Sequence, residues 1–144
     1  MIRIDFSVEI GRPPSEVFAY LTNLENLPEW QASAIDARWE GEKAAGARIK
    51  EVRKFLGRRM ESELEVLEYE PDRRFVLKTL TGPVPLVAEH TFEPTNGGTR
   101  LVFHGEGKPG GFFKLAEGVV ARNAERSVRN DFETLKDVLE ARAA

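Results

Sequence analysis

The sequence has no cysteine among its 144 residues, which excludes disulfides, thiolate zinc sites and cysteine nucleophiles. Its only histidines, His90 and His104, lack the spacing of a metal-binding pair. No apolar run approaches the ~18 residues that a membrane-spanning helix needs. The first ten residues alternate charged with apolar side chains, where a signal peptide needs an unbroken apolar stretch. We therefore expect a cytoplasmic protein with no metal, no cofactor and no integral association with a membrane.

An excess of charge of one sign is also lacking. The chain has 21 Lys and Arg against 24 Asp and Glu, a net charge of −3, so nothing global attracts nucleic acid or an anionic lipid surface. Residues 48–59 hold six basic side chains. The next segment supplies glutamates at matching positions, which favours a salt-bridged solvent face over a nucleic-acid site. We expect no nucleic-acid partner.

What the sequence does contain is typical of one folded domain. Hydrophobic residues make up 41% and charged residues 31% of the chain, which is ordinary globular composition. The length is close to the ~150 residues of one domain. We expect a single domain over residues 1–144.

Periodicity predicts an α+β fold. Residues 2–10 alternate apolar and polar side chains, as a strand with one buried face does. Residues 11–23 and 24–30 indicate two short helices. Residues 35–106 form a meander of strands separated by glycine and proline turns, and 112–141 carry the apolar stripe of one long helix.

Charge and hydropathy predict the same strand register. A two-residue turn at Leu56-Gly57 places Lys50 opposite Glu63 and Ile49 opposite Leu64, so one register pairs both charges and apolar residues. The same reasoning pairs Glu93 with Arg100 and Glu65 with Lys78. It also places Leu67 and Val76 together on the outer face, as an apolar spot that could serve a partner surface.

This order of elements resembles the helix-grip fold of the START-like (SRPBCC) superfamily, in which a curved antiparallel sheet of about seven strands wraps around a long C-terminal helix. Four phrases look like its polyketide cyclase/dehydrase branch: PPSEVFAYLTNLENLPEW, EVLEYEPDRRF, TFEPTNGGTRL and FETLKDVLEA. The resemblance covers essentially the whole chain. It implies a cavity between sheet and helix, which the superfamily uses for lipids, sterols, plant hormones and polyketides. It implies no catalytic residue, because the superfamily has no common catalytic motif.

The predicted inward faces supply candidate ligand-binding residues, and we expect a cavity of at least ~300 Å³. The candidates are Trp30, Glu51, Arg53, Met60, Leu64, Leu77, His90, Phe92, Phe103, Phe113, Glu117, Val120 and Ala124.

Five of the candidate positions carry alternatives. His90 could act as an acid or base, or it is a structural histidine. Glu51 and Arg53 could bind a polar head group or orient a catalytic water; alternatively their strand is frayed or bulged there, or Arg53 reaches the rim by its apolar stem. Glu117 could face the cavity or favour the positive end of the helix. Phe113 could gate the cavity or fix the helix entry.

Asp131 is a further carboxylate on the apolar stripe of the long helix, and a buried carboxylate needs a partner. A backbone amide, an arginine or a hydroxyl group in the contact between helix and sheet is the expected partner. A pairing of Asp131 or Glu117 with His90 as a catalytic dyad is the alternative.

Three functions fit these features. The first is binding, transport or sensing of a small hydrophobic ligand in the cavity. The second is a cyclase or dehydratase in which His90 removes a proton alpha to a carbonyl and Arg53 stabilises the oxyanion. The third is a non-catalytic interaction module, acting through its exposed sheet or as a homodimer.

Overall fold

The sheet of this protein has seven antiparallel strands in the order β1-β7-β6-β5-β4-β3-β2. A computed structural model describes residues 1–82, 84–108 and 117–142. The strands are β1 (Ile2–Ile10), β2 (Ala34–Glu40), β3 (Arg48–Phe55), β4 (Arg58–Glu70), β5 (Arg74–Thr81), β6 (Leu86–Thr95) and β7 (Gly98–Gly107). The helices are α1 (Pro14–Thr22), the 3₁₀ turn η1 (Leu24–Asn26), α2 (Leu27–Trp30) and α4 (Glu117–Ala141).

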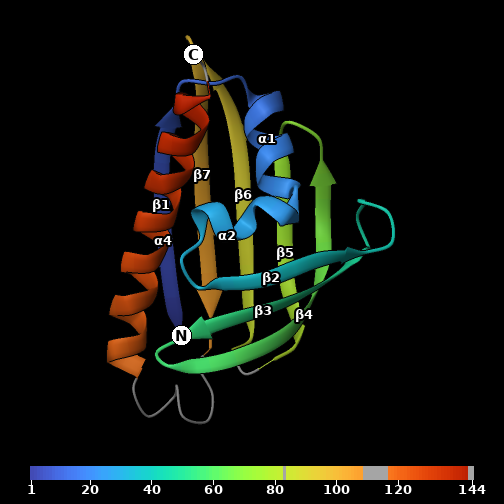
Figure 1. Ribbon diagram of the computed structural model, residues 1–144, viewed down its shortest axis with the longest axis vertical. Coiled ribbons are helices and arrows are strands. Elements are labelled where there is room, and N and C mark those ends of the chain that lie inside the picture. Colours follow the sequence, from blue (N-terminus) through green and yellow to red (C-terminus); the bar gives the residue numbers. More distant parts are fainter. Residues whose placement is uncertain (83, 109–116, 143–144) are drawn as a thin grey trace.

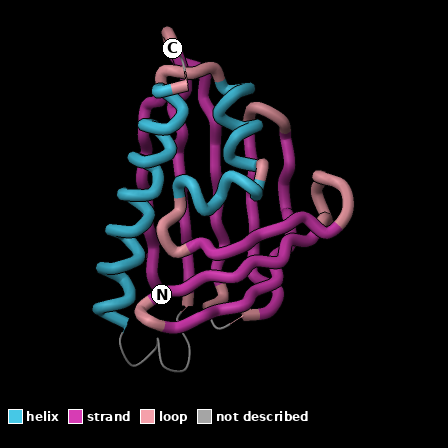
Figure 2. The backbone as a smooth tube through the Cα atoms, in the orientation of Figure 1, coloured by secondary structure: helices cyan, strands magenta, loops and turns pink. Residues whose placement is uncertain are grey.

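The helices of the described residues lie on one face of this sheet (Figure 1). The tube view shows α4 running along β1 while β2 and β3 cross in front of the sheet's other strands (Figure 2). The sheet is thus bent around the helices, and the predicted α+β helix-grip fold is confirmed.

The long helix buries the stripe that its periodicity predicts. Val120, Phe132, Leu135 and Leu139 are buried, and so is Asp131. The prediction began this helix at residue 112, but residues 109–116, Phe113 among them, lie outside the described residues. No helix in the described part of the chain is long and apolar enough to cross a membrane.

Predicted pairings are confirmed in three pairs of neighbouring strands. Lys50 pairs with Glu63 and Ile49 with Leu64 across β3 and β4. Glu93 pairs with Arg100 across β6 and β7, and Glu65 with Lys78 across β4 and β5.

The predicted pairing of Leu67 with Val76 is wrong. A register shift between Val66 and Glu68 places Glu68 opposite Val76, because a bulge inserts one residue on one strand only. Leu67 is exposed while Val76 is buried. The apolar spot expected on the outer face therefore does not form.

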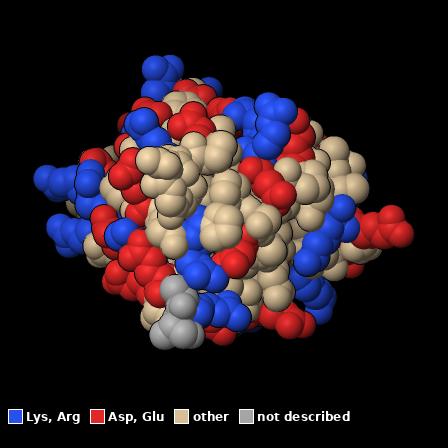
Figure 3. Space-filling model, turned by 90° about the horizontal axis from the view of Figure 1, so that it is seen from above, with Lys and Arg blue, Asp and Glu red and all other residues tan. Residues whose placement is uncertain are grey.

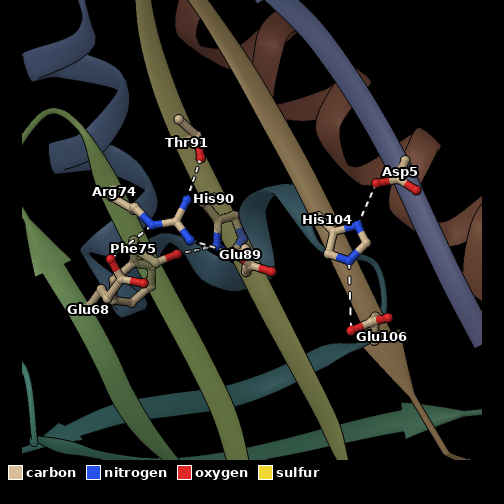
Figure 4. Close-up of polar contacts among 9 residues, drawn as sticks. All are labelled: Asp5, Glu68, Arg74, Phe75, Glu89, His90, Thr91, His104 and Glu106. Atoms are coloured by element: carbon tan, nitrogen blue, oxygen red, sulfur yellow. Dashed lines mark hydrogen bonds and ion pairs between the residues drawn. The ribbon is translucent and has the colours of Figure 1, made fainter.

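The outer face of the sheet is polar. Arg74 donates hydrogen bonds to Glu68, Glu89 and Thr91 from three nitrogens. Nearby, His104 lies within hydrogen-bond distance of Asp5 and its other ring nitrogen is 3.9 Å from Glu106 (Figure 4). These ion pairs keep the outer surface solvated while the opposite face packs against the helices.

Aromatic side chains fill the gap between the sheet and α1. Phe18 of α1 makes edge contacts with Tyr69, Phe75 and Phe92, with ring centroids 5.1–6.4 Å apart. Trp39 joins them from β2 and donates its indole hydrogen to the carbonyl of Thr22. The interior beneath α1 is therefore solid core.

Candidate functional site

A cavity of about 270 Å³ lies between the sheet and the first half of α4. Its lining comes from α4, from Trp30 and the residues that follow α2, and from every strand of the sheet except β2. The volume is slightly below the ~300 Å³ at which small-molecule pockets usually begin. The site is therefore suited to a small ligand.

Most of the predicted residues meet in this lining. They are Trp30, Glu51, Arg53, Met60, Leu64, Leu77, His90, Phe103, Val120 and Ala124. The strand periodicity therefore predicted the sheet wall of this cavity, and the helical periodicity predicted the helix wall.

Phe92 and Glu117 lie elsewhere. Phe92 is buried in the core against Phe18, with ring centroids 5.1 Å apart. The side chain of Glu117 is 49% exposed and lies 3.8 Å from the N-terminal amino group of Met1. Neither is part of the described cavity lining.

Arg53 and Glu51 form a two-pronged ion pair inside the cavity. They are two positions apart on β3 and so share one face of the strand. Arg53 donates from Nε and Nη2 to the two carboxylate oxygens of Glu51, at 3.0 and 3.1 Å. Its Nη1 donates to the hydroxyl oxygen of Ser33 at 2.9 Å. The register of β3 with β4 runs without a shift through both residues, so β3 is not frayed on this side. The side chains are only 23% and 10% exposed, so Arg53 does not reach out to the rim.

Asp131 brings a third charged group to the cavity from α4. Its Oδ1 accepts a hydrogen bond from the backbone amide of Ala32 at 3.1 Å, which is the kind of partner that its buried position demands. Burial raises the pKa of the Asp131 carboxyl, while the Ala32 amide and the charge of Arg53 act in the opposite direction.

His90 is a buried neutral side chain. Its Nδ1 lies 3.0 Å from the carbonyl oxygen of Phe75, so Nδ1 carries the proton and Nε2 is the unprotonated nitrogen. The rings of Phe75, Phe103 and Phe132 lie 5.3–6.0 Å from it. Burial lowers its pKa to about 4, against a small opposing effect of the hydrogen bond to Phe75.

Sequence reasoning missed several polar residues of the lining, Ser33 and Gln31 among them. Ser33 and Gln31 lie in the irregular segment between α2 and β2, where no periodicity assigns a face. Trp30 Nε1 and Gln31 Oε1 are buried without a hydrogen-bond partner among the described residues. Buried polar atoms of this kind are rare and each one needs an explanation.

A second, larger depression of about 730 Å³ lies between the start of α1 and the neighbouring ends of β5 and β6. Its lining residues are mostly exposed, among them Ser15, Asp72 and Glu93. We place the candidate site in the smaller cavity, because only there do charged and polar groups converge among buried apolar walls. In the described ranges of the chain, no group of three or more His, Asp or Glu side chains could hold a metal ion.

Comparison with protein families now adds to this geometry. The family described as polyketide cyclase / dehydrase and lipid transport matches residues 1–140. The chain belongs to this family. The sequence matches no protein of curated function.

Solved structures with the same fold come from several bacteria. TTHA0849 from Thermus thermophilus is similar with a TM-score of 0.85 and 18% identity, over 99% of both chains. The Zhui aromatase/cyclase of a Streptomyces species has a TM-score of 0.83 and 14% identity, over 99% of this chain and 95% of its own. The di-domain aromatase/cyclase StfQ of the steffimycin pathway has a TM-score of 0.72 and 15% identity, over 97% of this chain and 46% of its own. At these identities the likeness shows a common fold.

Proposed function

We propose that this protein binds a small, mostly apolar molecule that carries one polar group. The observation that supports the proposal is the ion pair of Arg53 with Glu51 inside a cavity whose other walls are largely aliphatic and aromatic. Ligand pockets usually combine apolar walls with a few convergent polar groups. The family, which includes lipid transport in its description, points in the same direction.

Arg53 is the residue that we expect to meet the polar group. A guanidinium has five N–H donors, and Glu51 and Ser33 accept from three of its nitrogens with one bond each. Two N–H groups are left for a ligand oxygen. A carboxylate or carbonyl oxygen fits these donors, because charge-assisted hydrogen bonds to arginine are the strongest of their kind.

Native mass spectrometry beside the denatured mass tests the proposal directly, with extraction of any small molecule that is released. A fluorescent fatty acid then serves as a probe for affinity. Ala124→Phe is expected to reduce probe affinity at least tenfold, because Ala124 lines the cavity and the larger ring fills it. Val119→Phe on the same helix is the matched control, since Val119 is 45% exposed. Equal affinities of the two variants, or no probe binding by the folded protein, would overturn the proposal.

A second candidate function is catalysis of the cyclase or dehydratase type. The observation that favours it is that two titratable groups with displaced pKa values, His90 and Asp131, line the same cavity as Arg53. In this reaction Nε2 of His90 takes a proton from the carbon alpha to a carbonyl. The electron pair of that C–H bond forms a C=C bond while the π pair of the carbonyl moves to its oxygen, and Arg53 stabilises the resulting enolate oxygen.

The lowered pKa of His90, about 4, weighs against this second function. A general base works best when its pKa lies near the operating pH. Turnover of a linear poly-β-carbonyl substrate, lost in His90→Gln and kept in His104→Gln, would favour catalysis over simple binding. Unchanged turnover in His90→Gln would exclude His90 as the base.

A further inference from the structure

The turn between β3 and β4 is built from a residue that suits it poorly. Phe55 pairs with Arg58, so Leu56 and Gly57 form a two-residue turn, with φ values of 50° and 77°. Positive φ at both positions is the type I′ turn, which strongly prefers Asn-Gly. Leucine rarely adopts positive φ, and the other such non-glycine residue among the described ones is Asp72, a residue that tolerates it. Leu56 is nevertheless 36% exposed, so core packing does not explain it.

Two charges of the same sign beside this turn also lower the stability of the hairpin. Lys54 pairs directly with Arg59 across the hairpin, and like charges in that position repel. Both are exposed, and neither has a salt bridge within the described ranges. The nearest acid on the same face of β4, Glu61, lies opposite Val52. Farther along the hairpin, charges of opposite sign lie together instead. Arg48 forms an ion pair with Glu63, with 2.9 Å between Nη1 and Oε1.

This hairpin tip, which we define as residues 54–59, adjoins the cavity. Phe55 within the tip and Met60 directly after it both line the cavity, as does Val120 of α4. Leu86 at the start of β6 lines it too and is 36% exposed. A ligand bound in the cavity is therefore close to the exposed apolar apex of the tip.

We propose that the hairpin tip docks on the surface of an anionic lipid bilayer. A leucine at the apex with cations on both sides matches that surface, because apolar side chains enter the acyl boundary while Lys and Arg meet the anionic head groups. The strain at Leu56 and the repulsion of Lys54 by Arg59 are then compensated by binding, as at other functional sites.

The inference rests on the proposed function in one respect: an apolar ligand would be exchanged with a bilayer.

The opposite end of the molecule, seen in Figure 3, shows acidic and basic side chains mixed over the surface. Such mixed charge offers a bilayer no local attraction. The net charge of −3 likewise indicates that docking depends on the local cations of the tip.

Flotation of the purified protein with vesicles tests the proposal, using phosphatidylcholine alone and phosphatidylcholine with phosphatidylserine. We expect binding to the anionic vesicles that weakens as salt rises. Lys54→Gln/Arg59→Gln should lower the partition coefficient about 30-fold, the effect of two surface cations. Leu56→Asn should lower it about tenfold by removing an inserted side chain, and should not unfold the protein, because asparagine suits the turn.

Lys43→Gln/Arg100→Gln is the matched control, since it also removes two cations and both lie away from the tip, in the loop between β2 and β3 and at the start of β7. Equal loss of vesicle binding in the control would overturn the proposal, and so would no binding of the folded wild type to anionic vesicles. Absence of vesicle binding together with retention on immobilised polyglutamate would replace the bilayer with an acidic protein partner. Probe binding in solution tests the cavity separately, so its failure overturns the proposed function and leaves the flotation result to decide the docking surface.

Discussion

Arg53 holds Glu51 by two hydrogen bonds of 3.0 and 3.1 Å on the cavity face of β3. Both side chains are mostly removed from water, with exposures of 23% and 10%. An ion pair in such a place adds little stability, because desolvation of two charges offsets their attraction. Its presence among apolar walls is better explained by a ligand that competes with Glu51 for Arg53.

Glu51→Gln should therefore increase the affinity for an anionic apolar probe. The amide keeps the shape of the side chain but removes the negative charge that competes for the guanidinium, so we expect about tenfold tighter binding. The free energy of unfolding should fall by about 1–2 kcal/mol, because the amide has one acceptor oxygen and so loses one of the two hydrogen bonds from Arg53. Fluorescence titration and urea unfolding measure the two effects.

Glu63→Gln is the control for this experiment. Glu63 pairs with Arg48 at 2.9 Å on the outer face of the same hairpin, so it removes the same charge outside the cavity. Arg53→Gln should weaken probe binding instead of strengthening it. A Glu51→Gln variant with unchanged or weaker affinity would contradict the assigned role of Arg53.

His90 predicts a pH dependence of stability. Its pKa is about 4 in the folded protein, below the ~6.5 of an unfolded histidine. Between these values the unfolded chain binds more protons, so stability is complete above pH ~6.5 and falls toward pH ~4, by about 3 kcal/mol from this group. Urea unfolding of wild type and His90→Gln across this range should show a weaker acid destabilisation in the variant.

His104→Gln is a control with the opposite sign. The hydrogen bond to the Asp5 carboxylate raises the pKa of His104, so its contribution is present below pH ~6.5 and is lost as the pH rises through the raised pKa. Removal of His104 should therefore change the profile at higher pH than removal of His90. Identical profiles for the two variants would show that His90 is not held neutral by burial.

Asp131 gives a further prediction about stability. Asp131→Asn keeps an oxygen that can accept the hydrogen bond from the Ala32 amide, and it removes a charge whose burial is unfavourable. It should be as stable as wild type or more so, whereas Asp131→Ala should lose about 1 kcal/mol with the hydrogen bond. Thermal unfolding of the two variants distinguishes them. Greater instability of Asp131→Asn would mean that the charge itself, beside Arg53, stabilises the fold.

The sequence predicts the strand registers because two independent patterns agree. In the hairpin of β3 and β4, Ile49 meets Leu64 and Lys50 meets Glu63 in one alignment, and any slip by one residue would break both pairings. The bulge at Leu67 leaves no such signal. Val66, Leu67 and the neighbouring strand are all apolar enough for either alignment, so the inserted residue is visible only in the structure.

The cavity lining is predictable in part for a related reason. Alternation assigns a side chain to a face but not to a place along it, so His90 and Phe92 share the inward face of β6. The structure separates them: His90 lines the cavity, while Phe18 of α1 covers Phe92. Helical periodicity likewise assigns Glu117 to the apolar stripe without its place along the helix. The structure places Glu117 at the first residue of α4, beside the amino group of Met1.

Gly98 offers a test of how tightly the sheet is packed beside the turn between β6 and β7. A Cβ at this position would lie 2.1 Å from the carbonyl oxygen of Ile10, and a backbone atom in a paired strand cannot move aside easily. Gly98→Ala should lower the free energy of unfolding by about 2–3 kcal/mol. Gly118→Ala is the control, because nothing lies within 4 Å of its Cβ position and alanine favours the helix by up to ~1 kcal/mol.

Gly98→Ala and Ala124→Phe together separate stability from ligand binding. Gly98 pairs with Thr95 at the turn of β6 and β7 and is not part of the described cavity lining. Its replacement should therefore leave the affinity of the fluorescent probe unchanged at temperatures where the variant is folded, while Ala124→Phe reduces that affinity at least tenfold. Loss of probe affinity in Gly98→Ala, measured far below its unfolding midpoint, would show that the solid core around Phe18 and the cavity do not behave as independent parts of the interior.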